Sequence, residues 1–168
     1  MPTINGKACV IDGTPVDKVF SNGVQVYGRN LISGSYDSSW SFYSLNNATV
    51  DKVTMDSGEV ALHVIGTSSV SGFYAVFNLP ANVSYTASVE VKGTGKVNTL
   101  GWQNWEAPEQ MPGMTPTSNW QRVSRTVSSD SKLPSFIFYG TMDVYVKLMK
   151  VEKGTIATPW TPAPEDVM

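Results

Sequence analysis

The sequence predicts an all-β protein that folds as a sandwich or a barrel. Short apolar segments alternate with Gly, Pro, Asn, Asp and Ser clusters along most of the chain, which is typical of regularly spaced strands. No window shows a sustained 3.6-residue apolar period with capping residues, so we expect little helix. The 168 residues are enough for one domain with a hydrophobic core.

The N-terminal part of the chain predicts two small hairpins. The Asn-Gly pair at 22–23 lies between two short apolar arms, and this is the strongest short-range signal for a β-hairpin. The Asp-Gly pair at 12–13 marks a second turn. We therefore expect residues 1–29 to form a hairpin and linker segment ahead of the main body, residues 30–168.

The main body contains seven segments with the apolar pattern of short strands. The clearest segment alternates strictly, with Tyr85, Ala87, Val89 and Val91 on one face. The tail, 158–168, is punctuated by proline and cannot pair as a central strand; we expect Trp160 to pin it onto the body. The seven segments are 59–66, 72–79, 84–93, 95–102, 119–127, 134–140 and 143–154.

Charge and composition exclude several classes of function. The net charge of -2 gives no basic field that would favour nucleic acid. No apolar run approaches the ~18 residues of a membrane span, so we expect no membrane insertion. The single cysteine, Cys9, cannot form an internal disulfide and rules out a cysteine-rich zinc site.

Catalytic chemistry has few candidates in this chain. His63 is the only histidine, and no nucleophile-elbow pattern accompanies it. We therefore expect His63 to be a strand residue on a polar face or rim. A glycosidase needs two opposed carboxylates, and Glu106 and Glu109 remain candidates to pair with another acid in space. We expect a protein that is not an enzyme and that has no cofactor.

Aromatic side chains are the main chemical asset of the sequence. It contains five Trp, seven Tyr and six Phe. Sugar rings present apolar C–H faces on which flat aromatic rings can stack, while amide and hydroxyl side chains read the sugar hydroxyls. The composition therefore supplies rings that could stack on a ligand, whereas it supplies few groups for a catalytic centre.

The segment "LGWQNWEAP" (100–108) holds the most promising pair of rings. On a regular strand, Trp102 shares its face with Lys96 and Asn98, which is the composition of a solvated sheet face more than of a core. Trp105 would then act as a side wall in the loop that follows. Packing of both rings in the core remains the alternative.

A second candidate region is the Ser-rich segment 35–47, which contains Trp40 and Tyr43. It either caps one end of the sandwich or lines a groove. Together the two regions give the predicted saccharide-binding residues, which are Trp102, Trp105, Gln103, Asn104, Asn98, Trp40 and Tyr43.

Several segments resemble a known family. "VYVKLMKVEKGTIATPWTPAPED" (144–166) resembles the closing segment of jelly-roll modules in tail proteins of phages that infect Gram-positive bacteria. "SNGVQVYGRNLI" (21–32) resembles the lead-in that links such modules to tail proteins. The middle segments "SYTASVEVKG" and "NWQRVSRTV" are similar to carbohydrate-binding modules of the same type.

The resemblance implies a jelly-roll β-sandwich of two antiparallel sheets, preceded by short N-terminal hairpins. It implies non-catalytic binding of host cell-surface saccharide by a carbohydrate-binding module of a phage tail or baseplate, in host recognition and adsorption. The expected partners are the host cell-wall or surface polysaccharide and other phage tail proteins, and the expected location is the virion, at the tail tip or baseplate. The alternatives are a structural or decorating module that binds only other virion proteins, and a cell-wall glycoside hydrolase domain.

Related jelly-roll modules often carry a structural calcium, so such an ion is also an open alternative here. The sequence contains no calcium-loop motif. The loose candidates for ligands are Asp37, Asp56, Glu59 and Asp143.

Overall fold

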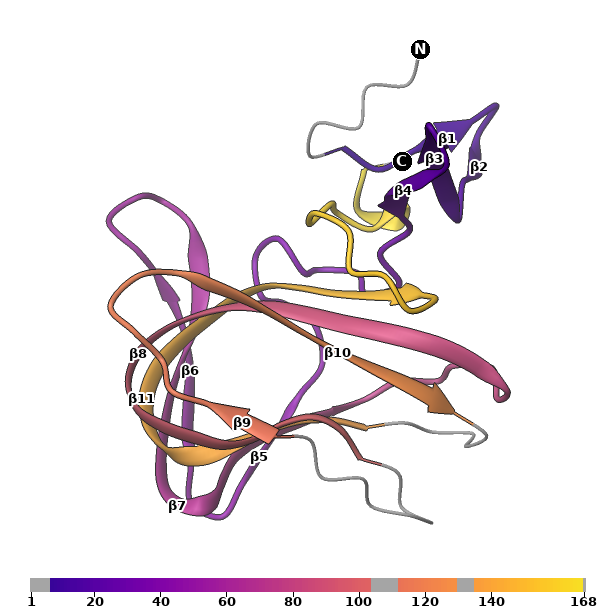
Figure 1. Cartoon of the computed structure of the whole chain (residues 1–168). Coiled ribbons are helices and arrows are strands. Elements are labelled where there is room, and N and C mark those ends of the chain that lie inside the picture. Colours follow the sequence, from indigo (N-terminus) through magenta and orange to yellow (C-terminus); the bar gives the residue numbers. More distant parts are fainter. Residues whose placement is uncertain (1–6, 104–111, 130–134, 168) are drawn as a thin grey trace.

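The computed structural model describes residues 7–103, 112–129 and 135–167, and it is an all-β structure (Figure 1). In these ranges the regular elements are strands, apart from one short 3-10 helix at Pro164–Asp166. No helix in the described part of the chain is long and apolar enough to cross a membrane. The prediction of a β-protein with little helix is confirmed.

Two small hairpins open the chain, as predicted. Strands β1 (Val10–Ile11) and β2 (Thr14–Pro15) form the first, and β3 (Lys18–Ser21) and β4 (Val24–Gly28) form the second. Each hairpin turns through two residues with positive φ, which are the Asp-Gly pair at 12–13 and the Asn-Gly pair at 22–23. Asn, Asp and Gly tolerate this backbone conformation best. The division of the chain at residue 29 stays a prediction.

The main sheet is antiparallel and is built around three long strands. Its order is β10-β8-β11-β7-β5, with β6 paired to β7 and β9 paired to β8. The first half of β8 pairs with β10 and with the end of β11, whereas its second half pairs with the start of β11. The same strands therefore supply both layers of the sandwich (Figure 1). The strands are β5 (Tyr43–Leu45), β6 (Thr49–Thr54), β7 (Val60–Val76), β8 (Val83–Gln103), β9 (Pro112–Met114), β10 (Gln121–Ser129) and β11 (Ser135–Lys153).

Each of the three long strands was expected as two shorter ones, and this part of the prediction is wrong. The glycine-flanked breaks between the predicted pairs lie within continuous strands. At the break in β11, which we call the bend, the pairing of β11 with both of its neighbours shifts register after Tyr139. A Cβ on Gly140 would lie against the carbonyl oxygen of Lys96, and a Cβ on Gly66 against that of Gly140. Only glycine allows the backbones to approach this closely.

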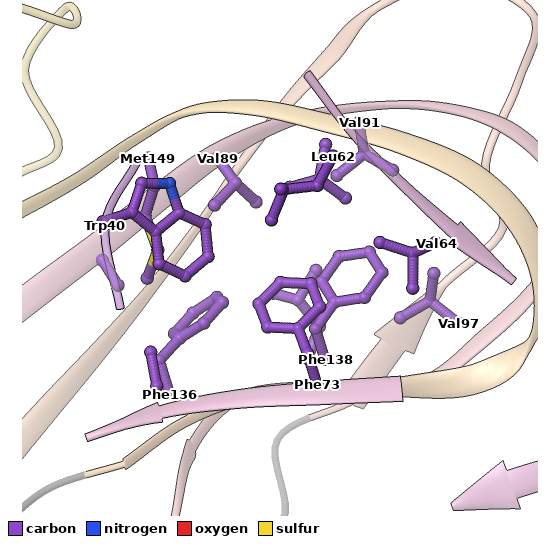
Figure 2. Packing of buried hydrophobic residues seen from close by; sticks show 14 of the residues in the cluster. Trp40, Leu62, Val64, Phe73, Val89, Val91, Val97, Phe136, Phe138 and Met149 are labelled. Atoms are coloured by element: carbon purple, nitrogen blue, oxygen red, sulfur yellow. The ribbon is translucent and has the colours of Figure 1, made fainter. Parts of the chain in front are cut away.

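The core lies between the layers (Figure 2). Phe73 of β7 and Phe138 of β11 stack with ring centroids 5.3 Å apart, at an interplanar angle of 6°. The four alternating apolar residues predicted to share one face of β8 are all buried in this cluster, which confirms that prediction. Labelled members of the core in Figure 2 are Trp40, Leu62, Val64, Phe73, Val89, Val91, Val97, Phe136, Phe138 and Met149.

A buried polar cluster fastens the C-terminal tail to the end of β11. The Thr158 backbone N–H and hydroxyl donate to the Glu152 carboxylate at 2.8 and 2.7 Å. The Lys150 ammonium donates to the Thr158 hydroxyl oxygen at 2.7 Å and to the Pro159 carbonyl at 2.8 Å. Lys150 and Glu152 are fully buried, so these hydrogen bonds replace the water that both charges lose on folding.

Asn30 ties the lead-in segment to the same region. Its amide nitrogen donates to the Ser35 hydroxyl at 2.9 Å and to the Thr161 carbonyl at 3.1 Å. Its amide oxygen accepts from the backbone N–H of Val151 at 3.2 Å. Trp160 donates its indole N–H to Ser35 at 3.3 Å, which confirms that this ring pins the tail. We call the contacts of residues 28–35 with 150–166 the tail seam.

The glycine bend generates the first prediction. Gly140→Ala should lower the free energy of unfolding by about 3 kcal/mol, at the top of the usual range for overpacking, because its Cβ has no room. Gly58→Ala is the control: Gly58 has φ +81° but open space around it, so only backbone strain of about 1 kcal/mol is expected. Urea unfolding of both variants measures the difference. Equal losses would contradict a steric origin.

The tail seam generates a prediction on pH. Burial lowers the pKa of Lys150 to about 8, whereas an unfolded lysine titrates near ~10.4. Between these values the unfolded chain binds more protons, so stability rises with pH. From pH 8 to pH 10 the free energy of unfolding should rise by on the order of 2 kcal/mol relative to Lys150→Met. Identical pH profiles for the two proteins would overturn this account.

Candidate functional site

A groove of about 610 Å³ lies on the face of the sheet that is turned away from the core. It runs across the second half of β7, the start of β11, the end of β8 and the end of β5. The described residues that line it are Leu45, Asn46, Ser69, Val70, Tyr74, Asn98, Thr99, Ser135, Ile137 and Tyr139.

Strand alternation explains why these side chains face the groove. On β11, Phe136 and Phe138 belong to the core, so Ser135, Ile137 and Tyr139 point to the opposite face. On β7, Tyr74 lies between two core residues in the same way. The strands thus bury phenylalanine on one side and present tyrosine on the other.

Tyrosines give the groove an aromatic surface: Tyr74 and Tyr139 line it, and Tyr43 lies beside Tyr74. Tyr43 and Tyr74 are cross-strand partners, and their rings stack with centroids 5.1 Å apart at 22°. Tyr43 is 55% exposed. Tyr139 is half-buried, and burial, followed by the influence of Tyr74, raises the pKa of its phenol. Its hydroxyl therefore stays protonated beyond the ordinary value of about 10 and keeps a hydrogen-bond donor.

Polar side chains complete the lining. Asn98 lines the groove and its amide oxygen accepts a hydrogen bond from the Thr141 backbone N–H at 3.4 Å, so its amide can still donate. Asn46 donates to the Val70 carbonyl at 2.8 Å. The Ser135 hydroxyl is buried and has no hydrogen-bond partner among the described residues. The arrangement combines flat rings with amide and hydroxyl groups, as in sites for polar small molecules.

The strand phase predicted through residues 96–102 is wrong, because β8 carries a bulge at Asn98. Tyr139 pairs with Thr99 and Gly140 with Val97, so Asn98 is an extra residue in β8. Val97 and Leu100 consequently both face the core, while Asn98 and Thr99 both line the groove. A one-residue shift of this kind exchanges the two faces of a strand. The predicted position of Asn98 on an open face is therefore correct, but for a different reason.

Trp102 lies in the core, which corrects its assignment to a saccharide site. Its side chain is 1% exposed, and its ring packs edge-to-face against Phe77 and Phe136 at 5.8 and 5.9 Å. Its indole N–H donates to the Arg125 carbonyl of β10 at 3.0 Å. Once the bulge at Asn98 is included, the even-numbered residues after it face inward, so Trp102 cannot contact a sugar.

Trp40 is also a core residue, and its prediction as a binding residue is wrong. It is 5% exposed and packs against Phe42 and Phe73 at 5.4 and 5.6 Å. Of the two alternatives for the Ser-rich segment, the position of Trp40 agrees with a segment that caps the end of the sandwich and not with one that lines a groove. Tyr43, three residues later, is exposed beside the groove, where its role in binding stays a prediction.

The remaining predicted site residues fall at the end of β8. Gln103 closes the strand and pairs through its backbone with Ser135. The side chain of Gln103, and the whole of Asn104 and Trp105, lie outside the described residues, as do Glu106 and Glu109. Their predicted roles remain predictions.

Tyr74 and Tyr139 were missed by the sequence analysis, although a signal for them exists. In "GFYAVFNL" and "PSFIFYG" each tyrosine is out of phase with neighbouring phenylalanines. Alternation alone therefore puts these tyrosines on the face opposite the Phe residues.

The candidate metal ligands do not come together. Among the described residues, no group of three or more His, Cys, Asp and Glu side chains is arranged to hold a metal ion. Asp37 pairs with Lys52, Glu59 with Lys147, and Asp143 with His63. His63 also stacks on Tyr145 at 4.6 Å, on the polar face where it was expected.

The fold belongs to the class of jelly-roll β-sandwiches, as predicted, and solved structures show the likeness. No protein-family model and no curated protein sequence matches this chain. The CBM22-1 xylan-binding domain of Xyn10C from Paenibacillus barcinonensis has a TM-score of 0.57 at 12% identity, covering 75% of this chain and 94% of that domain.

Two further structures of carbohydrate-binding modules are similar to this chain. The CBM22-1–GH10 modules of Clostridium thermocellum xylanase Xyn10B, complexed with xylohexaose, have a TM-score of 0.56 at 17% identity, over 77% of this chain and 28% of that one. TmCBM61, in complex with β-1,4-galactotriose, has a TM-score of 0.51 at 15% identity, over 76% of this chain and 100% of that one. At these identities the likeness establishes the fold.

The placement of Trp102 generates a prediction. Trp102→Ala should lower the free energy of unfolding by about 3–5 kcal/mol, the usual cost of emptying a tryptophan site in a core. Trp120→Ala is the control, because this partly exposed ring lies under Lys92 and Lys147 outside the core and should cost about 1 kcal/mol. Chemical denaturation compares them. If Trp102→Ala were as stable as the control, the core position of Trp102 would be contradicted.

Proposed function

We propose that this protein binds a saccharide through the groove and does not chemically convert it. The observation that carries the proposal is that two tyrosines, Tyr74 and Tyr139, line the groove, with Tyr43 stacked on Tyr74 at its side. Such rings offer large contact areas at low entropy cost, because a tyrosine side chain has few rotatable bonds. The amides of Asn46 and Asn98 lie beside them to read hydroxyl groups.

The size and composition of the groove support this proposal. Its volume of about 610 Å³ is within the range of about 300–1,000 Å³ for small-molecule sites. The similar modules named above are a xylan-binding domain and structures with xylohexaose and β-1,4-galactotriose. Because a shared fold does not fix function, these neighbours support the class of ligand only together with the groove.

A hydrolase is the weaker alternative. Glycoside hydrolysis requires two carboxyl groups that flank the scissile bond. The described lining of the groove consists of aliphatic, tyrosine, asparagine, serine and threonine side chains, and none of these is a carboxylate. Binding therefore accounts for this lining better than hydrolysis.

We place the function in a phage tail, at the tail tip or baseplate, where the module would bind the surface polysaccharide of a Gram-positive host and contact other tail proteins. This part of the proposal is supported by the resemblance of segments 21–32 and 144–166 to phage tail modules. In this context the saccharide would be the receptor for adsorption.

A second candidate function is contact with other virion proteins alone. It is favoured by three apolar side chains, Ile11, Phe20 and Val24, which are exposed on the N-terminal hairpins. Exposed apolar side chains that form a patch mark protein contacts, and this function requires these three to do so. The two functions use different surfaces and are separated by the glycan experiment below.

The test is a glycan array probed with the labelled full chain, which should bind an oligosaccharide or wall polysaccharide. Tyr74→Ala and Tyr139→Ala should each weaken binding about tenfold or more, as for aromatic contacts in the centre of a site. Tyr145→Ala is the matched control. Tyr145 lies on the same strand as Tyr139 and stacks on His63, outside the groove, so its loss should leave affinity unchanged.

Binding that survives both groove substitutions would remove the groove from the proposal. Absence of binding to every glycan would favour the virion-protein function. The tail context is tested separately on Gram-positive host cells, where surface labelling should be blocked by purified wall polysaccharide. Labelling that wall polysaccharide does not reduce would contradict the receptor role.

A further inference from the structure

Ser135 occupies an unusual position in the groove. It is the first residue of β11, and its side chain is on the same face as those of Ile137 and Tyr139. Its cross-strand partners are Val76 on β7 and Gln103 on β8. The Ser135 backbone is thus paired on both sides by strands of the sheet, which fixes the face on which its side chain lies.

The Ser135 hydroxyl is buried without a hydrogen bond. The residue is 2% exposed, and its Oγ has no partner among the described residues. A buried polar group left unpaired costs about 1–3 kcal/mol, and such groups are rare in folded proteins.

Other buried serines of this chain are hydrogen-bonded. Ser71 donates to the Asn46 carbonyl at 2.9 Å, and Ser88 accepts from Arg122 at 2.6 Å. Burial of serine in this fold therefore does not by itself leave a hydroxyl unpaired. Other buried side chains in the described part of the chain also have an unpaired atom, namely those of Gln25, Arg29, Trp40, Arg125 and Thr161, but none of these residues lines the groove.

The apolar surroundings of Ser135 increase the contribution that a single hydrogen bond makes to binding there. Ile137, the next residue on the same face, is almost fully buried and apolar. Tyr74 is the cross-strand neighbour of Ile137. Two residues along a strand span about 7 Å, so a sugar ring that rests on Tyr74 can reach the Ser135 hydroxyl. In such an apolar setting a hydrogen bond is stronger, and an unmatched polar group is more costly.

We infer that Ser135 is the specificity-determining residue of the groove, forming a hydrogen bond with one hydroxyl of the bound sugar. The inference rests on the proposed function and adds a ligand class to it: glycans in which that hydroxyl is free. Analogues in which it is removed or acylated are rejected, because the Ser135 hydroxyl then remains buried and unpaired.

The experiment uses the full chain and an array of oligosaccharides that includes xylohexaose and β-1,4-galactotriose. The probe for the next step is an oligosaccharide that the parent protein binds and Tyr74→Ala does not. Isothermal titration then compares the parent with Ser135→Ala on this probe and on its monodeoxy and O-acetyl analogues. Thermal unfolding of both proteins is measured without ligand.

The inference expects Ser135→Ala to lower affinity without lowering stability. Ser135→Ala should leave the melting temperature unchanged or raise it, because the variant removes an unpaired buried hydroxyl. Its affinity for the probe should fall about tenfold, and its preference for the probe over one of the deoxy analogues should disappear. The control Ser88→Ala should lower the melting temperature, because it removes a hydrogen-bond partner of the Arg122 guanidinium, and should leave affinity unchanged.

Three results overturn the inference and are distinguishable from one another. If the parent binds a glycan in a Tyr74-dependent way and Ser135→Ala binds it equally well, the proposed function stands and the role of Ser135 falls. If the parent binds no glycan on the array, both fall together. A loss of melting temperature that accompanies the loss of affinity would also contradict it, since that result assigns Ser135 a structural role.

Discussion

The bend shared by three strands is the constraint on which the rest of this structure depends. β7, β8 and β11 each pass through the bend at glycine positions, and Gly140 lies at its centre against the backbones of its neighbours. Because the strands continue through the bend, one set of residues builds both layers, and the register on one side fixes the register on the other. The core forms inside the bend, and the groove lies on the outer face of the strand segments that lead into it.

The tail seam joins segments 28–35 and 150–166, and none of the described residues that line the groove belongs to either segment. Asn30 and Thr158 satisfy backbone and side-chain groups across the join between the lead-in, β11 and the tail. Lys150 and Glu152 are buried there as a pair. A buried charged pair adds little net stability, but the loss of one partner is costly. These residues therefore specify how the lead-in and the tail attach to the sandwich, whereas the described residues that line the groove come from segment 45–139.

Local features of this protein could be predicted from sequence, and features set by distant contacts could not. The hairpin turns were predictable because Asp-Gly and Asn-Gly pairs encode positive φ by themselves. The inward face of β8 before the bend follows from strict alternation. The bulge at Asn98 has no local signal, since it exists only relative to the register of β11. That single extra residue moved Trp102 from the predicted open face into the core. The long strands were divided at their glycines for the same reason: a glycine between apolar runs fits a turn and a bend equally well.

The aromatic residues divide according to what their rings can tolerate. On β7 and β11 the phenylalanines face the core, whereas Tyr74 and Tyr139 face the groove, where the phenol hydroxyl can remain hydrated. Tyr43 and Tyr74 are stacked before any ligand arrives, so little side-chain freedom remains to be lost on binding, and such preorganisation favours affinity. The unpaired hydroxyl of Ser135 acts in the same direction, because its desolvation has already occurred on folding and a ligand hydroxyl would recover the missing hydrogen bond. Under the proposed function, the groove would therefore favour a ligand that offers both an apolar face and a hydroxyl group, as a sugar ring does.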